Sequence, residues 1–408
     1  MRAVVLAFAL AIAVGCSASS EAAAPTPTPL QREISGLPAR MDALHPDLFH
    51  ATPRVRFRTE AQALARRAPG LSRPQLVVGL MRILALPGPR DGHTGIYPLD
   101  PSHARPLNLY PLRLYDFADG LHVVAAQPAE LVGRRVAAIG GVPIARVVQL
   151  VRPLVPRDNE STRRWLLPEY VVTDEVLRGL GIVRGERATF AFGDGSEVEL
   201  EPLPAADFGA TLGSALAPLP TTHDPVWLRR LDEQHWLTTI DGGRAVYLGY
   251  RVTQGDTFGL SERLLRLARR PHVRKVIVDV RLNHGGDNTT YGSLLDALRQ
   301  PAVNRRGKLL VLLGRSTFSA AGNFVADVDR ATRATFVGEP SGGAPNQWGD
   351  SQSLTLTRSG LTAHVATSYQ QFAAANDRRL ATGPDIRVEP TAADFFAGRD
   401  PVLDRALR

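Results

Sequence analysis

Short apolar runs alternate with amphipathic segments across the C-terminal half of the chain, and this alternation limits the possible folds most strongly. The runs contain mainly Val, Ile and Leu, and the segments between them have the apolar spacing of a helix. We expect strands at 275–280, 309–313 and 335–337, and helices at 291–300 and 320–330. Strands that alternate with helices form a largely parallel sheet covered by helices. The sequence therefore predicts an α/β domain over residues 223–408.

Two further units precede this domain. Residues 30–98 have helical apolar spacing interrupted by Pro-Gly pairs, which predicts a small helical unit. Residues 99–222 contain short alternating runs, which predict a β-rich module. Within that module the stretch 130–144 resembles the closing strand and turn of a PDZ-like fold, and a generic hairpin accounts for it equally well. A second hairpin is expected at 354–367.

The N-terminus has the pattern of an export signal. An apolar run over 3–14 follows a basic start, and small residues lead to Cys16, the sole cysteine of the chain. Such a run is too short to span a bilayer. It resembles a bacterial lipoprotein box, which implies a signal peptide over 1–15, a lipidated Cys16 and a flexible tether over 16–29 at the outer face of a bacterial membrane. A plain secretory signal with an incidental cysteine is the alternative.

Charge and composition exclude several classes of function. The net charge is +8 and the pI is near 10.1, yet the arginines are spread along the chain without a basic block. This distribution argues against nucleic-acid binding and favours mild attraction to an anionic membrane surface. A single cysteine excludes disulfides and thiolate metal sites. We expect no metal and no organic cofactor.

Two loops carry residue types suited to catalysis. A buried strand ends in His284-Gly285-Gly286, where glycines allow close backbone approach and free N–H groups could bind an oxyanion. A second strand ends at a loop in which Ser319 precedes a helix, so the hydroxyl lies at the positive end of the helix dipole. Taken singly, a simple turn and a helix cap explain the two loops as well.

Together the two loops resemble the catalytic core of the tail-specific (C-terminal processing) peptidases. These enzymes have a crotonase-like ββα core and a nucleophile in a Thr-x-Ser-Ala turn, which here is Thr317-Phe318-Ser319-Ala320. The resemblance implies Ser319 as the nucleophile and the backbone N–H groups of Gly286 and Ala320 as oxyanion donors. Further matches are 337–343, 383–388 and 398–403. One departure is Gly322, where the family usually has Glu.

The general base also follows from the resemblance. The best-known branch uses a lysine that would fall on Ala344, and no lysine follows Lys308, so a Ser-Lys dyad is excluded. A second branch, which includes the tricorn core protease and interphotoreceptor retinoid-binding-like proteins, uses the His of an Asp-x-His-Thr motif. His93 matches it, and an imidazole is a suitable base at neutral pH.

The third triad member is expected to be a carboxylate that orients the imidazole. In the His-using branch it lies just under 60 residues after the serine, which here falls on Asp377. Glu339 and Asp91 are the alternatives.

The sequence thus predicts a serine-type peptidase that cleaves peptides or protein tails by an acyl-enzyme mechanism at the cell envelope. Two other functions stay open: a lipoprotein that binds peptides or apolar ligands without turnover, and an esterase or amidase. The sequence leaves the substrate preference and the oligomeric state undetermined.

Overall fold

The computed structural model describes residues 26–212 and 225–408. The predicted signal peptide, Cys16 and most of the tether lie outside these ranges. The described chain begins with three helices, α1 (Pro29–Asp42), α2 (Arg54–Arg67) and α3 (Arg73–Leu84), as the apolar spacing predicts. Capping boxes at Thr28 and Ser72 satisfy the first N–H groups of α1 and α3. Among the helices of the described ranges, none is both long and apolar enough to cross a bilayer.

The middle module contains strands and helices in similar measure. Its strands are β1 (Asn108–Leu109), β2 (Leu112–Phe117), β3 (Gly120–Ala126), β4 (Val136–Ile139), β5 (Val142–Pro143), β6 (Ala188–Phe192), β7 (Glu197–Leu200) and β8 (Leu203–Pro204). Its helices are α4 (Ile144–Val151), α5 (Glu160–Val171), α6 (Asp174–Gly179) and α7 (Ala205–Leu212). A sheet of order β5-β4-β6-β7 lies beside the separate pairs β2-β3 and β1-β8.

The expectation of a β-rich module is therefore correct only in part, because helices occupy much of the stretch between β5 and β6. The residues that resemble a PDZ closing strand form the antiparallel pair β4–β5. Gly140 and Gly141 turn this pair with φ of 55° and 75°, values that suit glycine. A PDZ-like identity of the module stays a prediction.

The C-terminal domain is a mixed α/β unit, as predicted. Its sheet has the order β16-β13-β12-β11-β10-β9, parallel except for the β9–β10 pair. The strands are β9 (His235–Ile240), β10 (Ala245–Tyr250), β11 (Lys275–Asp279), β12 (Leu309–Leu313), β13 (Thr335–Gly338) and β16 (Ile386–Arg387). The core on one face includes α8 (Phe258–Ala268), α9 (Gly292–Arg299) and α10 (Ala320–Ala331), and α12 (Pro401–Leu407) packs on the other. The short α11 (Ala392–Phe396) packs against the middle module.

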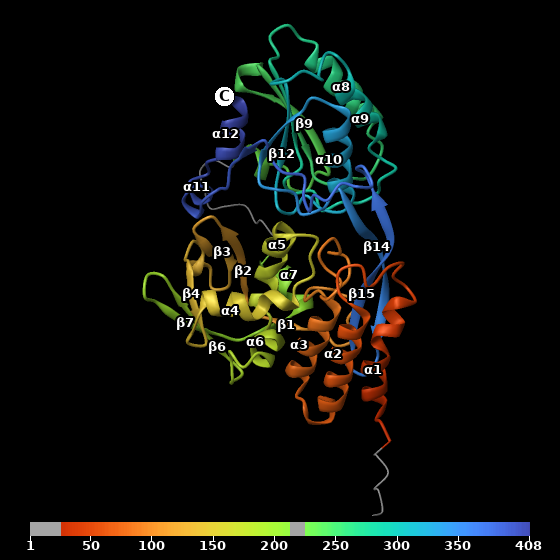
Figure 1. Cartoon of the computed structure of the whole chain (residues 1–408). Coiled ribbons are helices and arrows are strands. Elements are labelled where there is room, and N and C mark those ends of the chain that lie inside the picture. The colour runs from red at the N-terminus through yellow and green to blue at the C-terminus, as the bar shows by residue number, and fades with distance from the viewer. Residues whose placement is uncertain (1–25, 213–224) are drawn as a thin grey trace, which may run out of the picture.

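A long hairpin joins the two halves of the molecule. Strands β14 (Asn346–Leu356) and β15 (Leu361–Gln371) exceed the predicted hairpin and run from the C-terminal domain down along the N-terminal helices (Figure 1). Apolar side chains near the tip, such as Leu354 and Val365, belong to the same buried cluster as α1 to α3. The hairpin is thus part of the C-terminal domain in sequence and part of the N-terminal core in packing.

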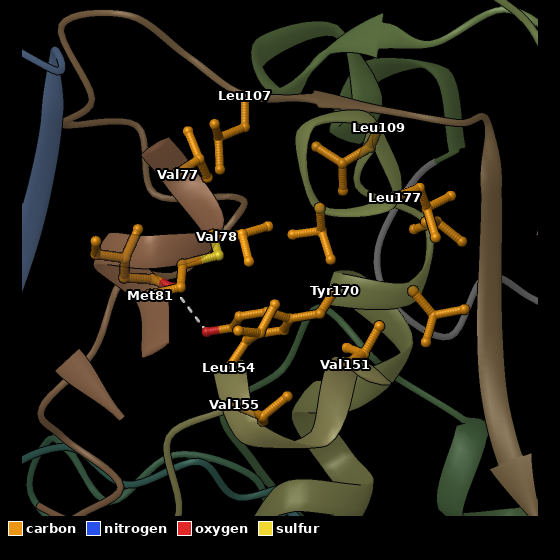
Figure 2. Close-up of a cluster of buried hydrophobic side chains, with 14 of the residues drawn as sticks. Val77, Val78, Met81, Leu107, Leu109, Val151, Leu154, Val155, Tyr170 and Leu177 are labelled. Carbon is orange, nitrogen blue, oxygen red and sulfur yellow. Dashed lines mark hydrogen bonds between the residues drawn. The ribbon is translucent and has the colours of Figure 1, made fainter. Parts of the chain in front are cut away.

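A buried tyrosine holds the segment after α3 in place through a hydrogen bond. Tyr170 of α5 lies among side chains of α3, the β1 region and α4 (Figure 2), and its hydroxyl donates to the Ile96 carbonyl at 2.7 Å. From the other side Gly95 forms a bridge with His364 of β15. The loop that carries His93 is therefore fixed to both the helical core and the hairpin.

Candidate active site

Ser319 has an unusual backbone conformation at the start of α10. Its φ of 54° and ψ of −131° lie in a sparsely populated region, which is costly for a residue with a side chain. It occupies the N-cap position of the helix, but its side chain makes no capping hydrogen bond. The hydroxyls of Ser316 and Thr317 donate to the Arg281 and Val280 carbonyls. The loop is thus tied to the end of β11, and the Ser319 hydroxyl remains available.

His93 meets Ser319 across the two halves of the molecule. The distance from His93 Nε2 to Ser319 Oγ is 3.0 Å, although the residues are 226 positions apart. The Phe318 ring stacks on the imidazole at 4.5 Å between centroids. This geometry suits transfer of the hydroxyl proton to Nε2, provided that the ring carries its proton on Nδ1.

Burial keeps this imidazole neutral. Desolvation is the largest influence and lowers the pKa of His93, while the negative charge of Asp91 acts in the opposite direction. Nδ1 is enclosed and makes no hydrogen bond within the described residues. The Trp348 backbone also raises the pKa of His93, although by less than Asp91 does. Its position relative to the ring does not meet the geometry of a hydrogen bond.

The structure does not bring Asp377 to the imidazole. Its carboxylate accepts from the Arg379 guanidinium at 2.8 Å and from the Arg379 backbone N–H at 2.9 Å, and this pairing lowers its pKa. The assignment as third triad member was based on spacing after the serine, and here that spacing ends in a turn closed by an arginine two residues on. The carboxylate is committed to a local ion pair.

The two alternative carboxylates are also engaged elsewhere. Glu339 binds the Arg315 guanidinium, with Nε at 3.2 Å. Asp91 is fully enclosed and lies 3.1 Å from His45 Nε2, and its other oxygen accepts from the Thr94 N–H at 2.9 Å. Asp91 therefore acts on His93 through space, as the largest influence that favours the imidazolium, and not through a hydrogen bond.

The predicted oxyanion donors lie beside the nucleophile. In the described ranges, neither the Gly286 nor the Ala320 backbone N–H donates to a protein acceptor. A Cβ at Gly285 would lie 2.6 Å from Ser319 Cβ and 3.0 Å from the Ala320 nitrogen, and one at Gly286 would lie 2.1 Å from the Thr253 carbonyl oxygen. Gly285 therefore allows close approach to Ser319, and Gly286 allows close approach to the Thr253 backbone.

Gly322 has a packing role. A Cβ at this position would lie 3.2 Å from the Gly343 Cα, so the loop after β13 packs directly on the first turn of α10. A side chain at this position would require the Gly343 backbone to move by a few tenths of an ångström. The two lysines lie elsewhere: Lys275 and Lys308 donate to the Ala406 and Ala268 carbonyls at 2.7 and 3.0 Å. Neither can serve Ser319 as a base in this geometry.

A buried carboxyl group that the sequence pattern did not indicate joins the His93 loop to the loop after β13. Asp158 is fully buried and accepts from the Gly92 N–H at 2.6 Å and from the Ala344 N–H at 3.1 Å. Burial raises its pKa to about 8, and the two N–H donors oppose this shift. An Asp before a helix is an ordinary capping pattern, so the sequence held no signal of this role.

Asn159 strengthens the same junction. Its Nδ2 donates to the Ser341 and Gly342 carbonyls, each at 3.0 Å, and its Oδ1 caps α5 through the Thr162 N–H. Asp158 and Asn159 together fix the His93 loop and the loop that packs on Ser319. We call this pair the Asp-Asn clamp.

Comparison with solved structures matches the chain to CPAF. Mature CPAF complexed with lactacystin is 14% identical, with a TM-score of 0.60 over 93% of this chain and 98% of that chain. A serine-to-alanine mutant of CPAF is 13% identical, with a TM-score of 0.63 over 92% and 96%. At such identities the likeness shows a shared mixed α/β fold over most of the chain.

Weaker matches include the photosystem II D1 C-terminal processing protease, at 12% identity and a TM-score of 0.42 over 92% of this chain and 99% of that chain. Another is the tricorn protease, at 14% identity and 0.35 over 92% and 36%. Both scores are too low to support an argument. No protein-family model and no curated protein sequence matches the chain.

The Asp-Asn clamp predicts that Asp158→Asn slows the reaction of Ser319. An amide presents an N–H₂ group to one of the two backbone donors, so one hydrogen bond is lost and the His93 loop shifts. A displacement of this kind typically slows chemistry by about 10²-fold. The measurement is the labelling rate of Ser319 by a fluorophosphonate. Asp404→Asn, at an exposed position, is the matched control. An unchanged rate in Asp158→Asn would contradict the role of the clamp.

The lowered pKa of His93 predicts the pH dependence of the same labelling. Only the neutral imidazole accepts the proton of Ser319, so the rate should rise with pH through the pKa of His93 and then stay level. Because burial lowers that pKa, the midpoint should lie below the ordinary value of 6.5. Labelling rates between about pH 5 and about pH 8 test this. A midpoint above 6.5 would show that nearby carboxylates outweigh burial.

Proposed function

We propose that this chain is a serine-type peptidase that cleaves peptides or protein tails through an acyl-enzyme on Ser319. The observation that carries the proposal is the 3.0 Å contact of His93 Nε2 with Ser319 Oγ, beside two unused backbone N–H groups. A hydroxyl next to a neutral imidazole and an oxyanion site is the arrangement that acyl transfer requires. The fold shared with CPAF agrees with this reading.

The mechanism has two halves. His93 takes the proton of Ser319 as Oγ attacks the substrate carbonyl carbon, and the Gly286 and Ala320 N–H groups bind the resulting oxyanion. The imidazolium then gives its proton to the leaving amine, and the acyl-enzyme forms. Water deprotonated by His93 then attacks the ester carbonyl, the bond to Ser319 Oγ breaks, and the imidazolium returns its proton to Oγ as the acid leaves. Within the described residues no carboxylate contacts Nδ1. The negative charge of Asp91 therefore stabilises the imidazolium through space and not through a hydrogen bond.

A non-catalytic peptide-binding protein on the same fold is the second candidate. The observation that favours it is the enclosed, unpartnered Nδ1 of His93, since a hydrogen-bonded acid normally fixes the tautomer needed for catalysis. Acylation of Ser319 distinguishes the two candidates, because a binding protein has no need of a reactive hydroxyl.

We also propose that the mature protein is a lipoprotein of the cell envelope. The support is the sequence pattern alone, in which an apolar run and small residues precede Cys16. Lipid on Cys16 and the basic body would together hold the protein at an anionic membrane surface.

The catalytic proposal predicts that Ser319→Ala and His93→Ala each lower peptide turnover by about 10³-fold or more, because the first removes the nucleophile and the second removes the base that activates it. Lactacystin, the compound in the CPAF complex, should block turnover by the unaltered protein. The measurement is hydrolysis of a fluorogenic peptide library, with the exposed Ser35→Ala as control. Full turnover by Ser319→Ala would refute the mechanism. Absence of both turnover and labelling in the unaltered protein would favour the binding protein.

The lipoprotein proposal predicts that Cys16→Ser moves the protein from the membrane fraction to the soluble fraction of a bacterial host. The mature unaltered protein should begin at Cys16 and carry the mass of acyl chains in intact-protein mass spectrometry. A plain secretory signal predicts instead a soluble, lipid-free product whose distribution is the same in both forms.

A further inference from the structure

A cavity of about 600 Å³ lies beside the loop at His284 and Gly285. His284, Gly285 and Ser316 form part of its wall, and the Gly285 backbone directly contacts Ser319. A group that fills the cavity is therefore within one or two residues of a peptide carbonyl positioned at the nucleophile. The cavity is large enough for a bulky side chain together with part of the adjoining backbone.

Most of the wall is apolar and includes the aromatic rings of Tyr115, Trp165 and Phe208. The Trp165 ring lies 4.6 Å from that of His284, and Phe208 closes another side. The remaining apolar lining comes mainly from Leu112, Leu114, Pro168, Val172, Leu231 and Val252. Such a wall favours an apolar, preferably aromatic, occupant.

Glu169 of α5 is the exception in this wall. Its carboxyl makes no hydrogen bond within the described residues, and burial raises its pKa to about 7 against the opposing charge of Arg113. A carboxyl group accepts hydrogen bonds in both its ionised and its protonated form, so an occupant with a donor pairs with it, whereas an apolar occupant leaves it unpaired at a cost of about 1–3 kcal/mol. The occupant therefore needs a donor.

The other charged groups of the wall already have protein partners. Arg164 binds Asp116 at 2.7 Å, Arg315 binds Glu339, and Arg251 donates to the Trp227 carbonyl at 3.1 Å. Arg113 lies over the Phe208 ring at 4.9 Å.

The net charge of the residues that line the cavity determines which charge its occupant can carry. Four arginines and two acids line the cavity, a formal charge of 4 − 2 = +2, which disfavours a cationic side chain. An acidic side chain would face Glu169 directly. A neutral side chain with a hydrogen-bond donor avoids repulsion by the arginines and by Glu169.

We infer that this cavity binds a neutral aromatic side chain with a terminal hydroxyl donor, such as tyrosine, and that Glu169 is the residue that selects it. The inference rests on the proposed peptidase function, since the side chain belongs to a peptide bound at Ser319. The Glu169 carboxyl accepts a hydrogen bond from the hydroxyl, while Trp165 and Phe208 contact the ring.

The test compares peptides that carry Tyr or Phe at each position around the scissile bond. At the position that enters the cavity, the unaltered protein should prefer Tyr by about 10-fold or more in kcat/KM, as expected for a hydrogen bond to a charged or strongly polar acceptor. In Glu169→Leu this preference should fall to about one with Phe peptides still cleaved, and Glu169→Gln should keep part of it. Equal use of Tyr and Phe at every position would overturn the inference, as would an unchanged preference in Glu169→Leu.

A binding measurement separates this inference from the peptidase proposal. Fluorescence anisotropy of the same peptides on Ser319→Ala needs no turnover, and Tyr should bind more tightly than Phe only while Glu169 is present. If this preference appears but the unaltered protein cleaves nothing, the cavity assignment stands and the peptidase proposal fails. If Ser319→Ala binds both peptides equally, the assignment fails. Since the Glu169 carboxyl makes no hydrogen bond in the described structure, Glu169→Leu should fold normally, and its thermal midpoint verifies this.

Discussion

The contact between His93 and Ser319 depends on the relative position of the N-terminal and C-terminal halves of the molecule, because each half supplies one of the two residues. His93 lies on a loop held by the N-terminal core, and Ser319 lies at the start of α10 in the C-terminal domain. Two devices fix this relative position. The β14–β15 hairpin crosses from one half to the other and pairs with Gly95, and the Asp-Asn clamp binds Gly92 on one side and Ala344 on the other. The Asp158 carboxyl suits this position because its two oxygens accept separately from the Gly92 and Ala344 N–H groups, one in each half.

The electrostatics of the dyad follow from burial more than from pairing. Enclosure lowers the pKa of His93 and keeps it a base, and it also leaves Nδ1 without a hydrogen-bonding acid in the described structure. Asp91 is near enough to favour the imidazolium but is held by His45 and Thr94. The site thus separates two tasks that one acid performs in a hydrogen-bonded triad: packing against Phe318 orients the ring, and a fixed charge stabilises its protonated form.

The sequence predicted those features that depend on local pattern. The central strands and helices of the C-terminal domain follow from apolar periodicity, and the motifs around Ser319 and His93 identified two residues that the fold brings together. Asp377 shows the limit of spacing, because an arginine two residues later captured the carboxylate. The helices α4 to α6 were missed within a stretch read as strands, and Asp158 gave no signal because its role depends on two backbone N–H groups from distant loops.

One backbone segment contributes both to the surroundings of Ser319 and to the wall of the cavity. In this segment Gly285 packs against Ser319, and His284 and Gly285 line the cavity. Neither Gly285 nor Gly286 tolerates a side chain, so the surroundings restrict the sequence of this segment. The side chains of α5 are then the part of the cavity wall that can vary and so determine which groups fit. The same helix carries the Asn159 cap at one end and Trp165 and Glu169 along the cavity. One helix therefore contributes both to the clamp and to the cavity wall, and under the proposed function a side chain bound in the cavity would contact the helix that also helps to position His93.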